Sequence, residues 1–435
     1  MTRCFALFVL LGLAWNSAQA QLASAVESDW AFLESLYLHL HQNPELSFEE
    51  VATARRMGDE LEAAGFEVTR NYGGHGVVGV MENGPGPVLM IRADMDGLPV
   101  REQTGLPYAS RAQAPDRDGN PTYVMHACGH DIHMSVFVGT ARQLNRRRDD
   151  WSGTLIMIAQ PAEERSGGAK AMLAQGLFEE FPRPNYNLAL HVASDLRAGT
   201  VGAVSGYFMA NVDSVDLLVQ GRGGHGAYPD RSKDPVVLAS QIVLALQTIV
   251  SREVSPFEPA VVTVGSIHGG TQHNIIPDQV KLQLTLRSYS PEVRNQTISS
   301  IRRIARNTAL AAGMGEDQLP AVTVLDEYTP AAYNNPQLTE RILKVFGDEL
   351  GADAIVAINA EMVGEDFGRY GAVEPKIPSL MFRLGTVEAG LHQDYINGNA
   401  SLPSLHSAAF APDPEPTIST GVRAMTAAAL NLLAK

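Results

Sequence analysis

The sequence has little cysteine, only two residues in a chain of 435. Cys4 falls in an N-terminal segment that we expect to be removed, and the remaining Cys128 cannot form an intramolecular disulfide by itself. A lone thiol in an oxidising compartment is easily oxidised unless it is buried or bound to a metal. Burial alone explains many isolated cysteines. Cys128, however, is flanked by His126 and His130, so we expect it to bind a metal.

The sequence also lacks an excess of basic charge and long apolar runs. Its formal net charge of −15 argues against a nucleic acid or an anionic membrane surface as a partner. The apolar run from Phe5 to Trp15 is shorter than the roughly 20 residues that span a bilayer. With Arg3 before it and Ala18-Gln19-Ala20 after it, the segment 1–20 is typical of a signal peptide. We therefore expect an exported protein, periplasmic or secreted, with no membrane-spanning segment after cleavage.

The length and the apolar pattern predict two domains, because 435 residues exceed one typical hydrophobic core. The early strand segments are continuously apolar, as in a buried parallel sheet. Apolar and polar residues then alternate, for example from Val215 to Val219, which predicts a sheet with one face open to water. We predict an α/β catalytic domain with a mostly parallel central sheet in two parts, 21–206 and 327–435, interrupted by an inserted α+β domain at 207–326.

The densest group of chemically functional side chains is the run His126-Ala127-Cys128-Gly129-His130-Asp131-Ile132-His133. One thiol, three imidazoles and a carboxylate within eight residues indicate a metal site. Cys128 and His130 are two residues apart, so their side chains point the same way in an extended segment but not on a helix. We therefore place them at a strand exit or in a loop, with Asp131 as the N-cap of a following helix.

Polar residues follow three apolar strand segments at their carboxyl ends, where open α/β sheets place their sites. Asp94 and Asp96 follow the first segment, Glu163 and Glu164 the second, and His191 the third. Adjacent side chains diverge, so one of the two glutamates can bind a metal while the other faces bound water. A pair of aspartates at a strand end also commonly stabilises a turn, so Asp94 and Asp96 could serve a functional site or only a turn.

Two helices are expected before the first strands. The first runs from Trp30 and stops at Asn43-Pro44, and we expect its His39 and His41 to lie at the surface or to interact with the helix dipole. The second should open with a capping box, in which Ser47 is the N-cap and Glu50 the third helical residue.

Several motifs in a fixed order resemble the amidohydrolase branch of metallopeptidase family twenty. That branch includes hippurate hydrolases and hydrolases of indole-acetyl-amino-acid conjugates, and it is related to aminoacylases and glutamate carboxypeptidases. The resemblance covers essentially the whole mature chain. The motifs are Pro44-Glu45-Leu46-Ser47, Ala93-Asp94-Met95-Asp96, His126-Ala127-Cys128-Gly129-His130-Asp131, Gln160-Pro161-Ala162-Glu163-Glu164, Gly223-Gly224-His225-Gly226 and Leu405-His406-Ser407.

This resemblance implies a zinc-peptidase-like catalytic domain and an inserted ferredoxin-like lid that forms a homodimer. It also implies two divalent metal ions, zinc or manganese, with cobalt or nickel as further options. Their ligands would be Cys128, His130, Glu164, His191 and His406, with Cys128 bridging the two ions.

The resemblance further implies that Glu163 is the general base and that Asp96 orients a ligand. In the lid, His225 would stabilise the oxyanion, and Asn274 and Arg287 would hold the substrate carboxylate. Other branches place a histidine ligand where Asp94 stands, so the contact of Asp94 with metal is left open.

The resulting hypothesis is an amidohydrolase that cleaves N-acyl or aryl-acyl amino acids to a carboxylic acid and a free amino acid. A dipeptidase or carboxypeptidase of the same family is the first alternative, because it needs the same metal centre. Its substrates would be short peptides. A non-catalytic exported binding protein is the second, although it would have no need of Glu163 beside Glu164.

Overall fold

The computed structural model describes residues 20–435, so the predicted signal peptide lies outside the described residues except for Ala20. The chain forms two compact units. Unit 1 comprises 20–206, 333–359 and 369–435, and unit 2 comprises 207–332 and 360–368. Residues 360–368 were not predicted to belong to the inserted domain. That segment joins unit 2 because the amide of Ala210 donates to Val363 at 2.9 Å and the amide of Glu361 donates to Phe208 at 3.0 Å.

The core of unit 1 is a seven-stranded sheet in the order β1-β2-β6-β3-β7-β17-β8. The four strands β6, β3, β7 and β17 run parallel, whereas β1, β2 and β8 pair antiparallel. The prediction of a mostly parallel sheet therefore holds at the centre but not at the edges. The strands are β1 Glu67–Tyr72, β2 Gly76–Asn83, β3 Val88–Asp94, β6 Gly153–Gln160, β7 Tyr186–Arg197, β8 Val201–Gly202 and β17 Ser379–Val387.

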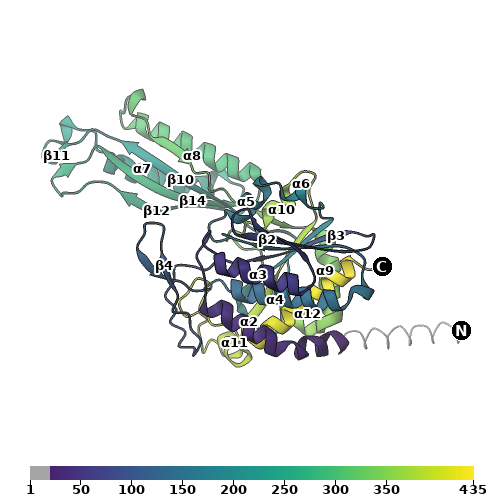
Figure 1. Ribbon diagram of the computed structural model, residues 1–435. Coiled ribbons are helices and arrows are strands. Elements are labelled where there is room, and N and C mark those ends of the chain that lie inside the picture. Colours follow the sequence, from purple (N-terminus) through teal and green to yellow (C-terminus); the bar gives the residue numbers. More distant parts are fainter. Residues whose placement is uncertain (1–19) are drawn as a thin grey trace. The chain divides into compact units, whose positions relative to one another are not determined.

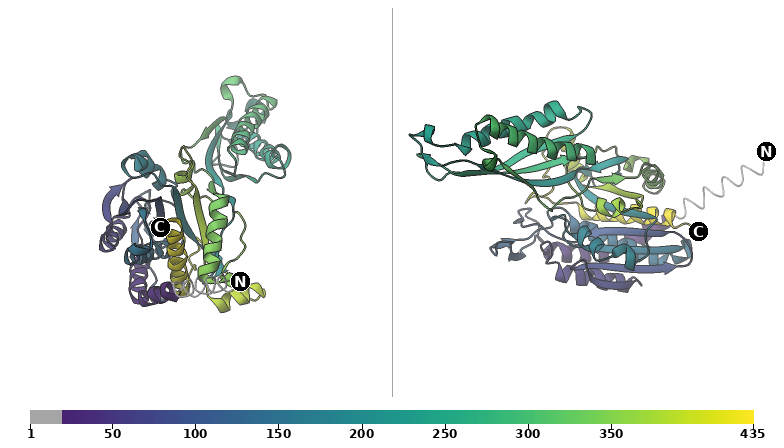
Figure 2. Two further views of the ribbon diagram at one scale, coloured as in Figure 1. Left: turned by 90° about the vertical axis from the view of Figure 1, so that its right-hand side faces the viewer. Right: turned by 90° about the horizontal axis from the view of Figure 1, so that it is seen from above.

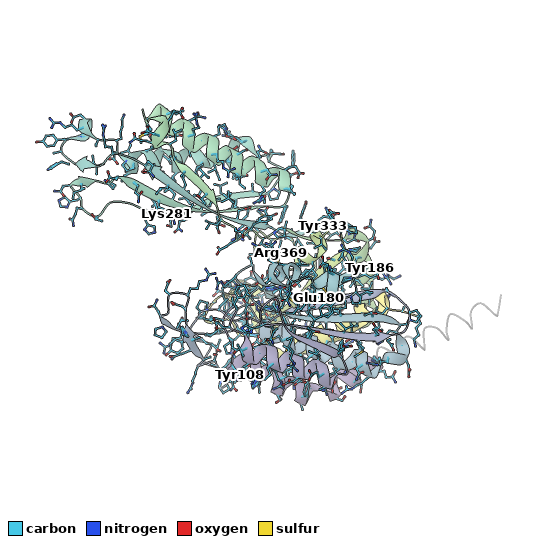
Figure 3. The ribbon with its side chains drawn as sticks, turned by 45° about the horizontal axis from the view of Figure 1, so that its top comes forward. Tyr108, Glu180, Tyr186, Lys281, Tyr333 and Arg369 are labelled. Atoms are coloured by element: carbon cyan, nitrogen blue, oxygen red, sulfur yellow. The ribbon has the colours of Figure 1, made fainter. Side chains whose placement is uncertain are left out.

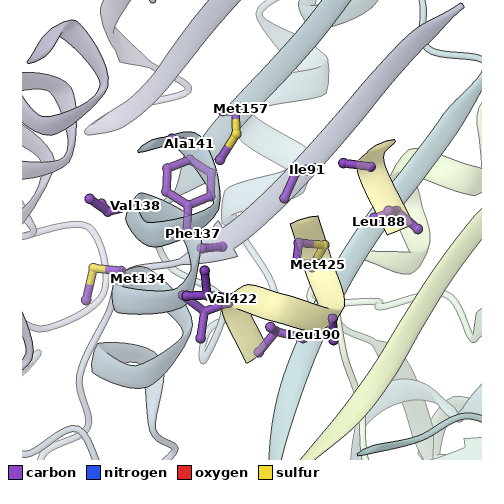
Figure 4. Close-up of a cluster of buried hydrophobic side chains, with 14 of the residues drawn as sticks. Ile91, Met134, Phe137, Val138, Ala141, Met157, Leu188, Leu190, Val422 and Met425 are labelled. Carbon is purple, nitrogen blue, oxygen red and sulfur yellow. The ribbon is translucent and has the colours of Figure 1, made fainter. Parts of the chain in front are cut away.

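Long helices cover this sheet, and Figure 1 shows α3, α4 and α12 together on one side of it. Helix α4 approaches α12 closely, since a Cβ on Gly139 would lie 2.5 Å from Val422 and one on Gly421 would lie 2.6 Å from Val136. Figure 4 shows the apolar core between these helices and the strands. The helices of unit 1 include α2 Trp30–Gln42, α3 Val51–Ala63, α4 His130–Arg146, α9 Pro336–Leu350 and α12 Pro414–Leu432.

Smaller elements complete unit 1. A two-stranded ribbon, β4 and β5, follows the first part of the sheet in sequence. Short helices occupy several connections. These elements are β4 Gln113–Pro115, β5 Pro121–Tyr123, α5 Gly168–Ala174, α6 Leu177–Glu180, α10 Gly368–Ala372 and α11 Ala389–Ile396.

Two helix starts differ from the prediction. Helix α4 begins at His130, and its N-cap is Gly129, which adopts a left-handed φ of +75°, so the prediction of Asp131 as N-cap was wrong. Helix α3 begins at Val51 with Glu50 in the N-cap position, and the predicted capping box is absent. The backbone of Phe48 takes a φ of +68°, which turns the chain before α3 and separates Ser47 from the helix.

Unit 2 has the connectivity βαββαβ with an antiparallel sheet in the order β12-β14-β10-β15. This is the ferredoxin-like arrangement that was predicted. Along β14, Val280, Leu282, Leu284 and Leu286 point inward, and Figure 2 shows both helices over the same face of the sheet. The elements are β10 Asn211–Gln220, α7 Pro235–Thr248, β12 Ala260–His268, β14 Gln279–Ser288, α8 Pro291–Ala311 and β15 Ala321–Val324.

One segment of unit 2 contradicts the expectation that nothing after the signal peptide could span a membrane. The helical stretch Pro235–Glu253 is long and apolar enough by length and composition, and a third of it is buried. Its inner side packs into unit 2 through Leu238, Ile242 and Leu246.

A buried histidine connects the end of α2 to α4. His41 is 1% exposed, so the prediction of a surface position was wrong. Its Nδ1 lies 2.7 Å from Asp131 and its Nε2 lies 3.3 Å from Glu102, while the rings of Tyr37 and Tyr108 pack around it (Tyr108 is labelled in Figure 3). Burial by itself lowers the pKa of His41, but the hydrogen bonds to Asp131 and Glu102 outweigh burial and raise it to about 9.

This pKa predicts a pH-dependent stability. Because the folded-state pKa lies above the ordinary value of 6.5, the contribution of His41 is complete below pH 6.5 and is lost as the pH rises through about 9. The shift corresponds to roughly 3 kcal/mol. The free energy of unfolding is measured in urea at several pH values. The difference between the wild type and His41→Gln should shrink across this window. The exposed neighbour His39, changed to Gln, is the control, and a pH-independent difference for His41→Gln would contradict the prediction.

Candidate metal centre

The parallel strands bring the predicted site residues to one edge of the sheet of unit 1. Strand β3 ends at Asp94, which is in register with Gln160 at the end of β6. His191 lies within β7, on the other side of β3. Because β6, β3 and β7 run in the same direction, the residues that follow their carboxyl ends meet at the same edge.

Cys128 lies at the centre of these residues. It is 5% exposed, and its Sγ is 3.5 Å from Nε2 of His191 and 3.3 Å from Nε2 of His406. Nε2 of His406 is also 3.4 Å from Oε1 of Glu164, which lies 3.8 Å from Nε2 of His130. The other four side chains predicted as metal ligands are therefore gathered around the thiol of Cys128.

Among the groups of three described residues that have the spacing of a metal site, two share Cys128. One is Cys128, His130 and His191, and the other is Cys128, Glu164 and His406, with the potential ligand atoms of each group within 4.8 Å of one another. Because Cys128 belongs to both groups, the arrangement fits two cation positions that share a thiolate. The role of each residue as a ligand stays a prediction.

The polar atoms at the centre also fit bound cations. Nε2 of His130 and Oε1 of Glu164 are buried and have no hydrogen-bond partner. An unpaired buried polar atom is costly, and a metal ion would satisfy both atoms. A thiolate with imidazoles and a carboxylate is a donor set that zinc and neighbouring divalent metals accept.

Two of the ligand candidates, Cys128 and His130, hold their protons strongly. Burial, reinforced by the carboxylates of Glu164 and Glu163, raises the pKa of the Cys128 thiol. Burial lowers the pKa of His130, but Asp94, Asp96 and Glu164 outweigh it and raise this pKa to about 10. A cation would therefore have to displace protons from both Cys128 and His130, so metal affinity should increase with pH.

His191 and His406 differ from His130 in charge. Burial, together with the charge of Arg383, lowers the pKa of His191 well below its usual value, and burial also lowers that of His406. Both imidazoles are therefore neutral near pH 7, which is the form that binds metal.

Asp94 is held by other partners. Its Oδ1 lies 2.6 Å from Nδ1 of His133, and Nη1 of Arg92 donates to its Oδ2. Nε2 of His133 accepts the amide of Val192 at 3.0 Å, so both ring nitrogens of His133 are engaged. Asp94 and His133 thus connect β3 to β7 beside His191. No role was predicted for His133, although its position three residues after His130 on a helix places both on one face.

His406 is returned to the site by a strained turn. Its φ is +65°, its amide donates to the carbonyl of Ala127 at 2.9 Å, and the amide of Gln103 donates to Ala408 at 2.7 Å. Its side chain is 55% exposed, unlike those of the buried ligand candidates. These contacts tie a loop near the C-terminus to the segment that carries Cys128.

The carboxylate of Asp96 holds the turn that carries the two glutamates. It accepts the amide of Glu163 at 3.1 Å and that of Glu164 at 3.0 Å. It also accepts the hydroxyl of Ser47 at 2.6 Å and lies 3.4 Å from Nδ1 of His130. These contacts are consistent with the predicted orienting role of Asp96.

The predicted lid residues all belong to unit 2. His225 is exposed in the short strand β11 Gly224–His225, which pairs with β13 Ile275–Ile276, and Asn274 directly precedes β13. Arg287 lies near the other end of β14, where it donates to Thr285 at 3.2 Å. Unit 2 therefore brings His225 and Asn274 together but not Arg287, and the roles of all three stay predictions.

Comparisons with known proteins show the family of this chain. The profile of the peptidase family M20/M25/M40 matches residues 90–409. An N-acetylcysteine deacetylase of Bacillus subtilis (strain 168) is 36% identical over 351 residues, which cover 80% of this chain and 86% of the relative. Thermostable carboxypeptidase 2 of Saccharolobus solfataricus is 34% identical over 351 residues, which cover 80% of this chain and 84% of the relative.

A solved structure has the same fold over nearly the whole length. The Bacillus subtilis YXEP protein, a dinuclear metal binding peptidase from the M20 family, is 30% identical with a TM-score of 0.75, and the match covers 94% of this chain and 99% of that one. These matches confirm the resemblance that the motifs indicated. The chain belongs to peptidase family M20/M25/M40.

Proposed function

We propose that this protein is a metal-dependent amidohydrolase that cleaves N-acyl or aryl-acyl amino acids to a carboxylic acid and a free amino acid. The observation that carries the proposal is the gathering of four potential ligands around Cys128, which is the fifth, with Glu163 directly beside the ligand candidate Glu164. The Bacillus subtilis relative, named as a deacetylase of an N-acyl amino acid, supports this class of substrate.

Cys128, His130, Glu164, His191 and His406 would hold two divalent cations. Cations bound there would lower the pKa of water and polarise an amide carbonyl. Glu163 would accept the proton of the attacking water and pass it to the leaving amine, which is a general-base and then a general-acid role. Asp96 would keep Glu163 in place through the amide of that residue.

The metal is proposed to be zinc or manganese. The thiolate of Cys128 and the imidazoles favour zinc, whereas the carboxylate of Glu164 also suits manganese. Cobalt and nickel can occupy the same donor set.

A carboxypeptidase or dipeptidase is the second candidate, because the Saccharolobus solfataricus relative is named a carboxypeptidase. Both activities need the same centre and differ in how the substrate pocket treats a free α-amine. The presence of Glu163 argues against a non-catalytic binding protein.

We also infer export and dimerisation. The segment 1–20 has the pattern of a signal peptide, and we propose a periplasmic or secreted location. In unit 2, Val237 and Leu244 on α7 are 54% and 73% exposed, and among the described strands β12 pairs only with β14. An apolar helix face beside an open strand edge would suit a second copy of this chain.

The first experiment measures amino acid release from a panel of N-acyl amino acids and dipeptides by the mature protein, with zinc or manganese and with a chelator. We expect chelator-sensitive release from the acylated substrates. Release only from dipeptides would move the protein to the peptidase class, and no release with either metal would contradict the proposal.

Two variants should separate the base from a ligand. Glu163→Gln should retain both metals and lower kcat by roughly 100- to 10,000-fold, because general-base catalysis contributes about that much. Cys128→Ser should reduce the metal content measured by elemental analysis, because both cation positions use the thiol. Near-normal turnover of Glu163→Gln would remove Glu163 as the base.

Replacing one exposed apolar side chain should dissociate the dimer. We expect Leu244→Lys to convert a dimer to a monomer in sedimentation experiments, because a charge would be buried in the interface. Asn307→Lys, which adds the same charge at an exposed position on α8, should leave the dimer intact. A monomeric wild type that binds phospholipid vesicles would show that a membrane covers this face instead.

A further inference from the structure

Acidic side chains from other segments bind the turn that carries Glu163 and Glu164. Three consecutive amides of this turn donate to acidic side chains: those of Glu163 and Glu164 to Asp96, and that of Ala162 to Oε1 of Glu50 at 2.7 Å. Asp96 was expected to orient a site residue. Glu50 was expected only to cap its own helix.

Glu50 does not cap that helix. It occupies the N-cap position of α3, but its side chain makes no capping hydrogen bond there. The side chain is 0% exposed and instead reaches Ala162, which is 112 residues away in sequence. A buried carboxyl group is costly, and the helix does not use this one as a cap, which indicates another role.

The backbone that Glu50 binds is in an unfavourable conformation. Ala162 has a φ of +50°, in the left-handed region that alanine rarely adopts, and it is fully buried. Its carbonyl accepts the amides of Gly167 and Gly168 at 3.1 and 3.2 Å, which closes the turn on its other side. Backbone strain of this kind persists where the surroundings impose it.

The segment that carries Glu50 packs against the whole turn. Ser47 donates to Asp96, and the ring of Phe48 lies so close to Gly167 that a Cβ there would be 2.6 Å from it. The side chain of Arg165 stacks over the same ring, with 5.4 Å between the guanidinium carbon and the ring centroid. Residues 47–50 therefore form a support for the turn 162–167.

We propose that Glu50 is a positioning residue, which holds the strained backbone of Ala162 so that Glu163 and Glu164 face the metal centre. This role rests on the proposed function of those two glutamates. Displacing a reacting group by about 1 Å can cost 100-fold in rate, and partners behind metal ligands typically contribute 10- to 100-fold in affinity or activity.

The test compares four proteins: the wild type, Glu50→Ala, Glu50→Gln and Glu45→Ala. Glutamine can still accept the amide of Ala162. It also resembles the protonated acid that prevails at pH 7, because burial and the charge of Asp96 raise the pKa of Glu50 to about 8. Glu45 is the matched control, since its carboxylate binds the amides of Ala52 and Thr53 in α3 but does not bind the turn.

Zinc and manganese affinities are measured by equilibrium dialysis, and kcat and KM at saturating metal. We expect Glu50→Ala to lower metal affinity about 10- to 100-fold and kcat about 100-fold, and to leave KM within about threefold of the wild type. Glu50→Gln should restore most of the metal affinity and most of kcat. Glu45→Ala should lower the melting temperature and leave affinity and kcat within about twofold. If Glu50→Ala does not fold, Glu50→Asp, whose shorter side chain withdraws the acceptor, should change both quantities in the same direction.

Wild-type affinity and kcat in Glu50→Ala would overturn the proposal. Losses in Glu45→Ala as large as those in Glu50→Ala would overturn it too, because they would reflect stability alone. If the wild type itself hydrolyses no substrate, the proposed function fails, and the metal affinities still decide the role of Glu50.

Discussion

The concentration of buried charge around Cys128 is the constraint on which the rest of unit 1 depends. Glu164, Asp94 and Asp96 place carboxylates within a few ångströms of His130 and of a thiol whose pKa burial raises. Buried charges are tolerated only when they are paired or coordinate a metal. The protein pairs part of this charge itself, through Arg92 and His133 at Asp94, and leaves atoms of His130 and Glu164 without a hydrogen-bond partner.

Several residues around the centre have an unfavourable backbone conformation. Phe48, Ala162 and His406 all adopt positive φ values, although none is a glycine. Each is fixed by its surroundings: Ala162 by Glu50, His406 by the carbonyl of Ala127, and Phe48 by the turn against which its ring packs. Such conformations cost about 1–3 kcal/mol each, so they indicate positions where accurate placement matters more than local stability.

A second layer of buried polar contacts lies behind the centre. His41 binds Asp131, which directly follows His130, and this places a charged network beneath the first turn of α4. The same helix packs against α12 through glycines that permit close contact. The start of α4, and with it His130, is therefore held both by a polar network and by apolar packing.

The sequence by itself determined the elements and the identities of the ligand candidates. The continuous apolar pattern predicted a buried sheet, and the alternating pattern predicted a sheet with one face open to water. The order of the motifs indicated the ligand candidates Cys128, His130, Glu164, His191 and His406. These features are encoded locally, in residue type and spacing. The edges of the sheet were not predictable in this way, because β6 lies between β2 and β3, and such pairing depends on segments about 70 residues apart.

Only the tertiary structure decided which polar residues support the site. Ser47 and Glu50 matched a capping box, and His41 resembled a surface residue at a helix end. Their actual partners are Asp96, Ala162 and Asp131, between 49 and 112 residues away along the chain. A local pattern cannot reveal such partners, because a short polar side chain satisfies its hydrogen bonds equally well within its own turn or across the fold. The choice is made when burial removes water and leaves one partner within reach.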